Sequence, residues 1–260
     1  MANSGAAQRP HPIEDLGRPP DFDPDRSSLF LDLDGTIAPL ELTPQAVAPD
    51  AARRRLLDAL VVRLDGRLAV ISGRPLADLD RVLEGRVRAV GAVHGLVRRT
   101  SAGKIEAAPG EARLRAALAE ISAYAATDSR LLVEDKALAV ALHYRRVPEA
   151  AVASRDLMQR LASRLDLQVQ EGDMVVEVRV DGPDKGAAIA AFMSETPFAG
   201  GMPVFLGDDL TDEDGFRAVR EQGGVAIVVG PRRPTGASYA LPGVEAARAW
   251  LWAGLGGETA

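Results

Sequence analysis

The stretch Leu29–Thr36 constrains the fold more than any other part of the chain, because a short apolar run ends there in two carboxylates and a glycine. Such a run is typical of a buried strand. Side chains two apart in a strand point the same way, so Asp32 and Asp34 face together while Leu33 packs on the opposite side. Two carboxylates this close would take up a proton unless a cation lies beside them. The stretch therefore predicts a Mg²⁺ site that also receives a phosphate at the carboxyl end of a strand, although a strand ending in a plain acidic turn is the alternative.

Composition limits the classes of protein. The chain has 260 residues, enough for one domain with a substantial insertion or for two domains. A net charge of -6 argues against nucleic acid as a partner, and no apolar run approaches the length of a membrane span, so we expect no membrane partner either. The chain has no cysteine, which excludes disulfides and thiol catalysis and fits a reducing compartment. We therefore expect a cytoplasmic protein, and we expect it to be a monomer.

The rhythm of apolar segments divides the chain into a leader, a core and an insertion. Residues 1–26 carry five prolines and are predicted to form a flexible leader. Residues 27–96 and 184–258 alternate short apolar strands with amphipathic helices, which predicts an α/β core built on a parallel sheet. Residues 97–183 instead combine hairpin-like strands with two helices. We interpret them as an inserted α+β cap domain.

Two loops offer groups that bind phosphate. Ser72 and Gly73 follow the second predicted strand, where a hydroxyl and backbone N–H groups can converge on a phosphate oxygen, although an ordinary helix N-cap explains the pair as well. Lys185 precedes a helix, in a chain whose only other lysines are Lys104 and Lys136. A lysine kept where arginine is the rule indicates a need for a compact ammonium, here beside a carboxylate and a phosphoryl group. A solvent-exposed lysine is the alternative.

A run of acidic residues follows another apolar strand at positions 207–214. Part of it is explained by helix capping, because Thr211 or Asp212 can cap the next helix and acidic residues in a first turn suit its dipole. Asp208 lies closest to the strand and has no such explanation. We predict that it completes the Mg²⁺ site with Asp32.

Together these loops resemble a known family. The runs Asp32-Leu-Asp-Gly-Thr, Ser72-Gly-Arg, Lys185-Gly and Gly207-Asp-Asp-Leu-Thr-Asp-Glu are similar, in order, to the four motifs of the haloacid dehalogenase superfamily of phosphatases. More narrowly, the chain resembles the trehalose-6-phosphate phosphatases in that last run, in His94-Gly95, in Val133–Lys136 leading to His143–Arg145, and in Val175–Arg179. The resemblance covers about residues 27–255. It implies a Rossmann-like core interrupted by a mobile α+β cap.

The resemblance also implies roles at the matched positions. Asp32 is the nucleophile that forms an aspartyl-phosphate, and Asp34 is the general acid and then the base. Mg²⁺ is held by Asp32, the backbone carbonyl of Asp34 and Asp208, while Asp209 and Asp212 orient these ligands from behind. The residues implied to bind the phosphoryl oxygens are Ser72, Gly73 and Lys185. The residues implied to meet the hydroxyls of the sugar are His94, Gly95, Lys136 and Glu177.

The implied activity is Mg²⁺-dependent hydrolysis of trehalose 6-phosphate, with a small-molecule sugar phosphate as the partner. Hydrolysis of another sugar phosphate and a sugar phosphomutase are close alternatives, because they share the nucleophile and the cap. A catalytically silent binding module is an alternative of another class. It is disfavoured because such a module has no need of Asp32, Asp34, Lys185 and Asp208 together.

Overall fold

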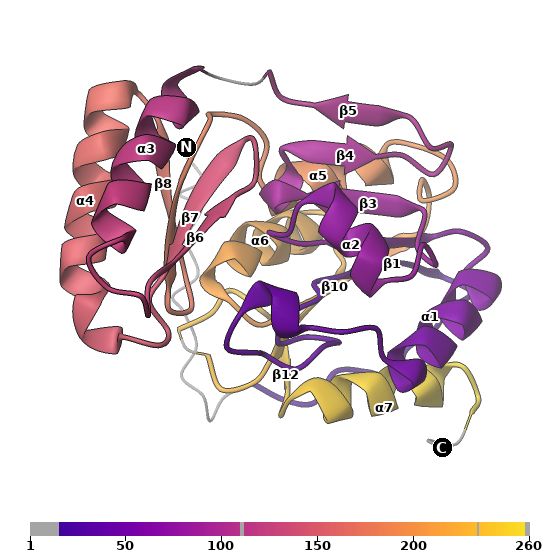
Figure 1. Cartoon of the computed structure of the whole chain (residues 1–260). Helices are drawn as coiled ribbons and strands as arrows, with labels where there is room; N and C mark the ends of the chain where they lie inside the picture. Colours follow the sequence, from indigo (N-terminus) through magenta and orange to yellow (C-terminus); the bar gives the residue numbers. More distant parts are fainter. Residues whose placement is uncertain (1–15, 110–111, 233, 258–260) are drawn as a thin grey trace, which may run out of the picture.

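A mostly parallel sheet runs through the core of the protein (Figure 1). The computed structural model describes residues 16–109, 112–232 and 234–257. Within them this core sheet has eight strands in the order β12-β11-β10-β1-β2-β3-β4-β5, parallel from β12 to β3 and antiparallel beyond. The strands are β1 (Ser27–Leu31), β2 (Leu68–Ile71), β3 (Ala89–Ala92), β4 (Val97–Arg99), β5 (Ile105–Ala107), β10 (Met202–Gly207), β11 (Val225–Val229) and β12 (Tyr239–Leu241).

Helices cover both faces of the core sheet. They are α1 (Ala51–Arg63), α2 (Leu76–Val82), α5 (Lys185–Met193), α6 (Glu213–Glu221) and α7 (Val244–Gly254). Side chains of β1 alternate between the two faces, so Leu29 and Leu31 pack with the leucines of α1, while Phe30 packs against Phe192 of α5 and Phe198. Every residue of β1 is buried as a result. Burying one such side chain is worth about 1.5–3 kcal/mol, which fixes β1 at the centre of the core.

The insertion builds its own antiparallel sheet in the order β6-β7-β9-β8, seen at the left of Figure 1. Its elements are α3 (Ala112–Ala125), β6 (Leu132–Asp135), β7 (Ala139–His143), α4 (Ala151–Leu165), β8 (Gln168–Gly172) and β9 (Val175–Arg179). Val140, Leu142, Val176 and Val178 share one face of this cap sheet and pack in the same cluster as α3 and α4. The opposite face is left for polar side chains. The predicted fold class, an α/β core on a parallel sheet with an inserted α+β cap, is confirmed.

The first hairpin of the insertion belongs to the core sheet. β4 and β5 fall inside residues 97–183, which the sequence predicts as the cap, but β4 pairs with β3 and β5 pairs with β4. The reason is the short connection: after β3 the chain makes one turn of 3-10 helix, η3 (Val93–Gly95), and returns beside the strand it has just left. The cap sheet therefore begins with β6.

The predicted leader also needs a correction. Residues 1–15 lie outside the described residues, but residues 16–26 pack against the core. Phe22 is buried, with its ring centroid 5.3 Å from that of Trp250, and the Trp250 Nε1 donates to the Pro20 carbonyl oxygen at 2.9 Å. The prolines of this segment predicted flexibility, whereas its one aromatic side chain supplies enough apolar surface to hold it in place.

The helices of the described residues are short. The longest, α4, has 15 residues, whereas a helix needs about 20 apolar residues to span a bilayer. None of the described helices meets that length and apolarity.

Candidate active site

Four loops meet at the carboxyl ends of the central strands. β1 lies between β2 and β10, so the residues that follow these strands share one edge of the sheet, and the amino end of α5 lies beside them. They line a cavity of about 150 Å³. The predicted site residues around it are Asp32, Asp34, Ser72, Gly73, His94, Lys136, Glu177, Lys185, Asp208 and Asp209.

Lys185 is buried at this edge between two carboxylates. Its Nζ donates to Asp32 Oδ1 at 2.8 Å and to Asp212 Oδ1 at 2.6 Å. Burial by itself would lower the pKa of Lys185, but the charges of Asp212 and Asp32 raise it above its ordinary value. Lys185 therefore carries a fixed positive charge next to the residue predicted to be the nucleophile, and the exposed-lysine alternative is wrong.

Three carboxylates form a compact acidic group. Asp32, Asp208 and Asp212 each offer an oxygen within 4.8 Å of the others. Burial raises the pKa of Asp32 to about 7, against the opposing charge of Lys185. Burial, followed by the charge of Asp32, raises the pKa of Asp208 to about 10. Crowded buried carboxylates of this kind are stabilised in the ionised form by a bound cation, and oxygen donors are those that Mg²⁺ prefers.

Asp212 organises the loop that carries Asp208. It is fully buried, and its Oδ2 accepts hydrogen bonds at 2.9 Å from the backbone N–H groups of both Asp208 and Asp209. The sequence predicts that Asp212 orients the metal ligands from behind. The structure also places one oxygen of Asp212 within the acidic group, whereas the sequence predicts the backbone carbonyl of Asp34 as the third metal ligand.

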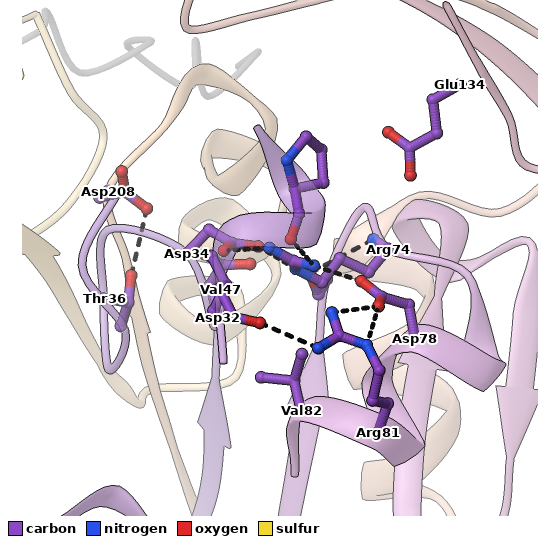
Figure 2. A network of polar contacts seen from close by, with 12 residues as sticks. Asp32, Asp34, Thr36, Val47, Arg74, Asp78, Arg81, Val82, Glu134 and Asp208 are labelled. Atoms are coloured by element: carbon purple, nitrogen blue, oxygen red, sulfur yellow. Dashed lines mark hydrogen bonds and ion pairs between the residues drawn. The ribbon is translucent and has the colours of Figure 1, made fainter. Parts of the chain in front are cut away.

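Arg74 holds Asp34 in a fixed orientation (Figure 2). Its Nε donates to Asp34 Oδ2 at 2.6 Å and its Nη2 donates to Asp34 Oδ1 at 2.8 Å. The remaining Nη1 donates to the Pro44 carbonyl oxygen at 2.9 Å and also contacts Asp78. Burial would lower the pKa of Arg74, but its bonds to Asp34 and Asp78 raise it above its ordinary value. Only the planar fork of an arginine can meet three such partners at once, and Arg74 ties Asp34 to the loop 39–46 that lines the cavity.

The polar face of the cap sheet closes the cavity from the other side. Alternation along the strands puts five cavity-lining residues on this face: Glu134, Lys136, His143, Val175 and Glu177. Ala141 is paired with Glu134 on one side and with Glu177 on the other, so a small residue lies between the two acids. Figure 2 shows the Glu134 carboxylate pointing toward the Arg74 network. Sequence reasoning assigned no role to Glu134 or Arg74.

Glu177 connects the cap to the core. The Lys136 Nζ contacts Glu177 Oε1, and His94 Nε2 lies 3.6 Å from the same oxygen. Burial would raise the pKa of Glu177, but the charge of Lys136 lowers it well below its ordinary value. Burial lowers the pKa of His94. Among the described residues, both ring nitrogens of His94 and the Glu177 Oε2 are buried without a hydrogen-bond partner. Each such atom costs about 1–3 kcal/mol until a ligand or water satisfies it.

The two predicted glycines make close approaches possible. A Cβ at Gly73 would lie 2.4 Å from Cε1 of His94, so the glycine leaves room for the imidazole ring. Gly95, at a φ of +102°, packs against the Asp184 carbonyl oxygen, where a Cβ would lie at 2.4 Å. Gly95 thus packs the segment that leads into the insertion against the segment that leads out of it. It does not line the cavity. Ser72 is buried at the cavity, with its Oγ 3.4 Å from the Arg74 N–H that donates to it.

Comparisons with known proteins identify the family of the chain. Residues 30–245 match the model of a family described as trehalose-phosphatase. The chain is 41% identical over 226 residues to the trehalose-6-phosphate phosphatase of Escherichia coli, covering 85% of this chain and 84% of the other. It is 39% identical over 229 residues to a probable trehalose-phosphate phosphatase of Sinorhizobium fredii, covering 87% and 86%.

Solved structures share the fold. The C-terminal domain of the Candida albicans trehalose-6-phosphate phosphatase superimposes with a TM-score of 0.79 at 23% identity, covering 89% of this chain and 93% of that one. A trehalose-6-phosphate phosphatase related protein superimposes with a TM-score of 0.71 at 26% identity, covering 86% and 94%. The resemblance to the trehalose-6-phosphate phosphatases predicted from the motifs is confirmed, and the chain belongs to the trehalose-phosphatase family.

Proposed function

We propose that the protein hydrolyses trehalose 6-phosphate to trehalose and phosphate, with Mg²⁺ and through an aspartyl-phosphate. One observation carries the proposal: a single cavity joins the Asp32–Lys185 pair of the core to the buried Lys136–Glu177 pair of the cap. The first pair suits phosphoryl transfer and the second suits a neutral polyol. The names of the two bacterial relatives support this substrate.

The chemistry follows from the charges around Asp32. Lys185 holds one oxygen of Asp32, which leaves the other to attack phosphorus. The bond between phosphorus and the sugar oxygen then breaks, and Asp34 donates a proton to that oxygen. Asp34 next accepts a proton from the water that cleaves the aspartyl-phosphate. Ser72 and the Lys185 ammonium neutralise and orient the phosphoryl oxygens throughout.

The acidic group suits the metal. Asp32 and Asp208 would hold Mg²⁺, with Asp212 or the Asp34 carbonyl oxygen beside them. When bound, Mg²⁺ supplies positive charge next to the carboxylates and the phosphate. This charge offsets the burial and the carboxylate repulsion that raise the pKa of both Asp32 and Asp208.

The cap face supports recognition of hydroxyl groups. Lys136 can only donate hydrogen bonds, whereas Glu177 Oε2 can only accept them while ionised. Within the part of the chain that the structure describes, Glu177 Oε2 and both ring nitrogens of His94 have no hydrogen-bond partner. A sugar carries several hydroxyls that both donate and accept, so it can satisfy all three residues at once.

A phosphate-release screen tests the proposed function. Purified protein with Mg²⁺ is offered trehalose 6-phosphate, other sugar phosphates and p-nitrophenyl phosphate, and free phosphate is measured. The proposal requires kcat/KM for trehalose 6-phosphate to exceed that for every other ester. A higher kcat/KM for another sugar phosphate would show that this other ester is the substrate. Transfer of the phosphoryl group between positions of the sugar, without release of phosphate, would identify a phosphomutase.

The buried cap pair leads to a prediction about selectivity. We expect Glu177→Gln or Lys136→Met to lower kcat/KM for trehalose 6-phosphate about tenfold or more, because a hydrogen bond to a charged group is worth about 1.5–3 kcal/mol. For p-nitrophenyl phosphate, which lacks the hydroxyl groups of a sugar, kcat/KM should stay within about threefold. Both substrates are measured on each variant.

Two checks separate recognition from folding in this experiment. Glu171→Gln is the matched control, because Glu171 lies on the cap sheet but its side chain is exposed and pairs with Arg155. The double variant Glu177→Gln, Lys136→Met should melt no lower than either single variant, since it leaves no unpaired buried charge. Equal losses on both substrates would show that the pair supports the fold or the chemistry rather than the sugar.

Arg74 leads to a prediction about turnover. We expect Arg74→Lys to lower kcat/KM about tenfold or more on every substrate, because an ammonium cannot hold both oxygens of Asp34. Arg81→Lys is the matched control: its hydrogen bonds go to Asp78 and the Val47 carbonyl oxygen in the same network (Figure 2). That variant should stay within about twofold of the parent, since an exposed pair is worth little. Equal losses in the two variants would contradict a specific role of Arg74 in positioning Asp34.

The cytoplasmic location and the monomeric state stay predictions. Size-exclusion chromatography with light scattering tests the second directly, because the expected mass of a single chain is 27.5 kDa.

A further inference from the structure

The cap touches the core at the tip of its last hairpin. The cap tip, residues 172–174, joins β8 to β9 and includes Met174 at a φ of 59°. Arg145 supports the tip from within the cap, since its Nη2 donates to the Asp173 carbonyl oxygen at 2.9 Å and to Asp173 Oδ2 at 2.8 Å. Tyr144 N–H donates to the Met174 carbonyl oxygen at 3.0 Å. The tip is therefore a rigid projection of the cap.

Asp209 of the core contacts the cap tip. The backbone N–H of Asp173 donates to Asp209 Oδ2 at 3.0 Å. The fit is close, because a Cβ at Gly172 would lie only 2.8 Å from the same oxygen. The other oxygen of Asp209 lies 3.3 Å from Nη1 of Arg232, so the carboxylate is braced by the core while it holds the cap. The Asp209 side chain is 20% exposed, whereas Asp173 is exposed, so this hydrogen bond lies at the surface where cap and core meet.

The same residue is linked to the acidic group through its backbone. The N–H groups of Asp208 and Asp209 share Asp212 Oδ2, and the other oxygen of Asp212 holds Lys185. The loop that carries Asp208 thus presents Asp208 to the acidic group and the neighbouring carboxylate to the cap. The position of the cap and the geometry of the predicted metal site therefore both depend on this one loop.

We propose that Asp209 is a positioning residue that latches the cap tip onto the core and thereby sets how often the cap is closed over the substrate. The inference rests on the proposed function, in which a closed cap brings Lys136 and Glu177 to the sugar. It differs from the role that the sequence predicts, in which Asp209 orients the metal ligands. A latch affects the cap and the large substrate, whereas a support for metal ligands affects Mg²⁺ and every substrate.

The position of the cap can be measured without any substrate. The chain has no cysteine, so two introduced cysteines take spin labels at known sites. Val62 on α1 of the core and Val152 on α4 of the cap are 81% and 68% exposed, which suits labelling. Distances between the two labels are recorded by pulsed electron paramagnetic resonance in the Val62→Cys, Val152→Cys protein and in the same protein with Asp209→Ala.

We expect Asp209→Ala to move most of the distance distribution to an open position, and Asp209→Asn to restore much of the closed one, because the amide oxygen still accepts from Asp173 N–H. In the protein without labels, Asp209→Ala should raise KM for trehalose 6-phosphate about tenfold, and the loss of kcat/KM should be larger for trehalose 6-phosphate than for p-nitrophenyl phosphate. Asp214→Asn is the matched control, since Asp214 lies in the first turn of α6 and pairs with Arg217.

Two results would overturn the proposal. One is a distance distribution that Asp209→Ala leaves unchanged. The other is a weaker Mg²⁺ dependence of Asp209→Ala together with equal losses of kcat/KM on both substrates. That result would show that Asp209 orients the metal ligands. Gly172→Ala tests the latch from the cap, because its methyl group displaces the tip with Asp209 intact and should open the cap in the same way. Since the distances need no turnover, failure of the proposed substrate leaves this measurement intact.

Discussion

Asp32→Asn is expected to lower kcat by about 10³-fold or more on every phosphate ester, because the amide has the shape of the carboxylate but is a poor nucleophile. The amide oxygen can still accept the hydrogen bond from Lys185, which lies at 2.8 Å in the parent. Folding should not suffer. The substitution removes one of three close carboxylates and, with it, a charge that adds to burial in raising the pKa of Asp208, so the melting temperature should stay equal or rise.

The measurement is phosphate release at saturating substrate, together with a thermal melt of each variant. Asp156→Asn serves as the matched control, because Asp156 is exposed on α4 of the cap, away from the cavity. Activity of Asp32→Asn within tenfold of the parent would remove the aspartyl-phosphate from the proposed mechanism. Loss of activity with a collapsed melting transition would instead mark Asp32 as structural.

The convergence of the motif loops could be predicted from the sequence alone. Asp32 and Asp208 are 176 positions apart, yet each directly follows an apolar run that reads as a buried parallel strand. The carboxyl ends of adjacent parallel strands share one edge, so the residues that follow them must meet. For the same reason Lys185, at the start of the helix that precedes β10, arrives beside Asp32.

Arg74 and Glu134 could not be assigned in the same way. Arg74 is part of the Ser72-Gly-Arg run, and Asp78 follows four residues later, a spacing that indicates an ion pair between Arg74 and the first turn of α2. Its bond to Asp34 joins residues 40 positions apart, and no local pattern specifies it. Glu134 belongs to an alternating strand, where an acidic residue usually faces solvent. Only the docking of the cap turns that face toward the cavity.

The remaining differences come from strand pairing and packing over long distances. The pattern of β4 and β5 indicated a hairpin correctly, but which sheet a hairpin joins depends on its neighbours. β12 has only three residues and was not predicted, because its stability comes from pairing with β11 at the edge of the sheet. Phe22 likewise finds its partner, Trp250, at the other end of the chain.

The acidic group makes the metal-free protein sensitive to pH, and the sign follows from the raised pKa values. An aspartate in the unfolded chain releases its proton near pH 4, whereas Asp32 and Asp208 in the folded protein hold theirs to about 7 and about 10. Between about pH 4 and these values the folded state binds more protons than the unfolded state. The free energy of unfolding of the metal-free protein therefore falls as the pH rises through this window. A cation that replaces these protons stabilises the protein more at high pH than at low pH.

Removal of the metal is accordingly expected to abolish turnover, and Mg²⁺ should restore it. Asp208→Ala should lower kcat/KM at least about hundredfold at a fixed Mg²⁺ concentration, because it removes a ligand oxygen from the acidic group. In thermal melts of the parent, the rise in melting temperature caused by Mg²⁺ should grow from about pH 6 to about pH 8.5, and Asp208→Ala should flatten this trend. Asp214→Asn, in the same acidic run but paired with Arg217, should keep both the activity and the trend. Unchanged activity in excess chelator would exclude the metal from the mechanism, and a Mg²⁺ effect that shrinks with rising pH would contradict ligation by these carboxylates.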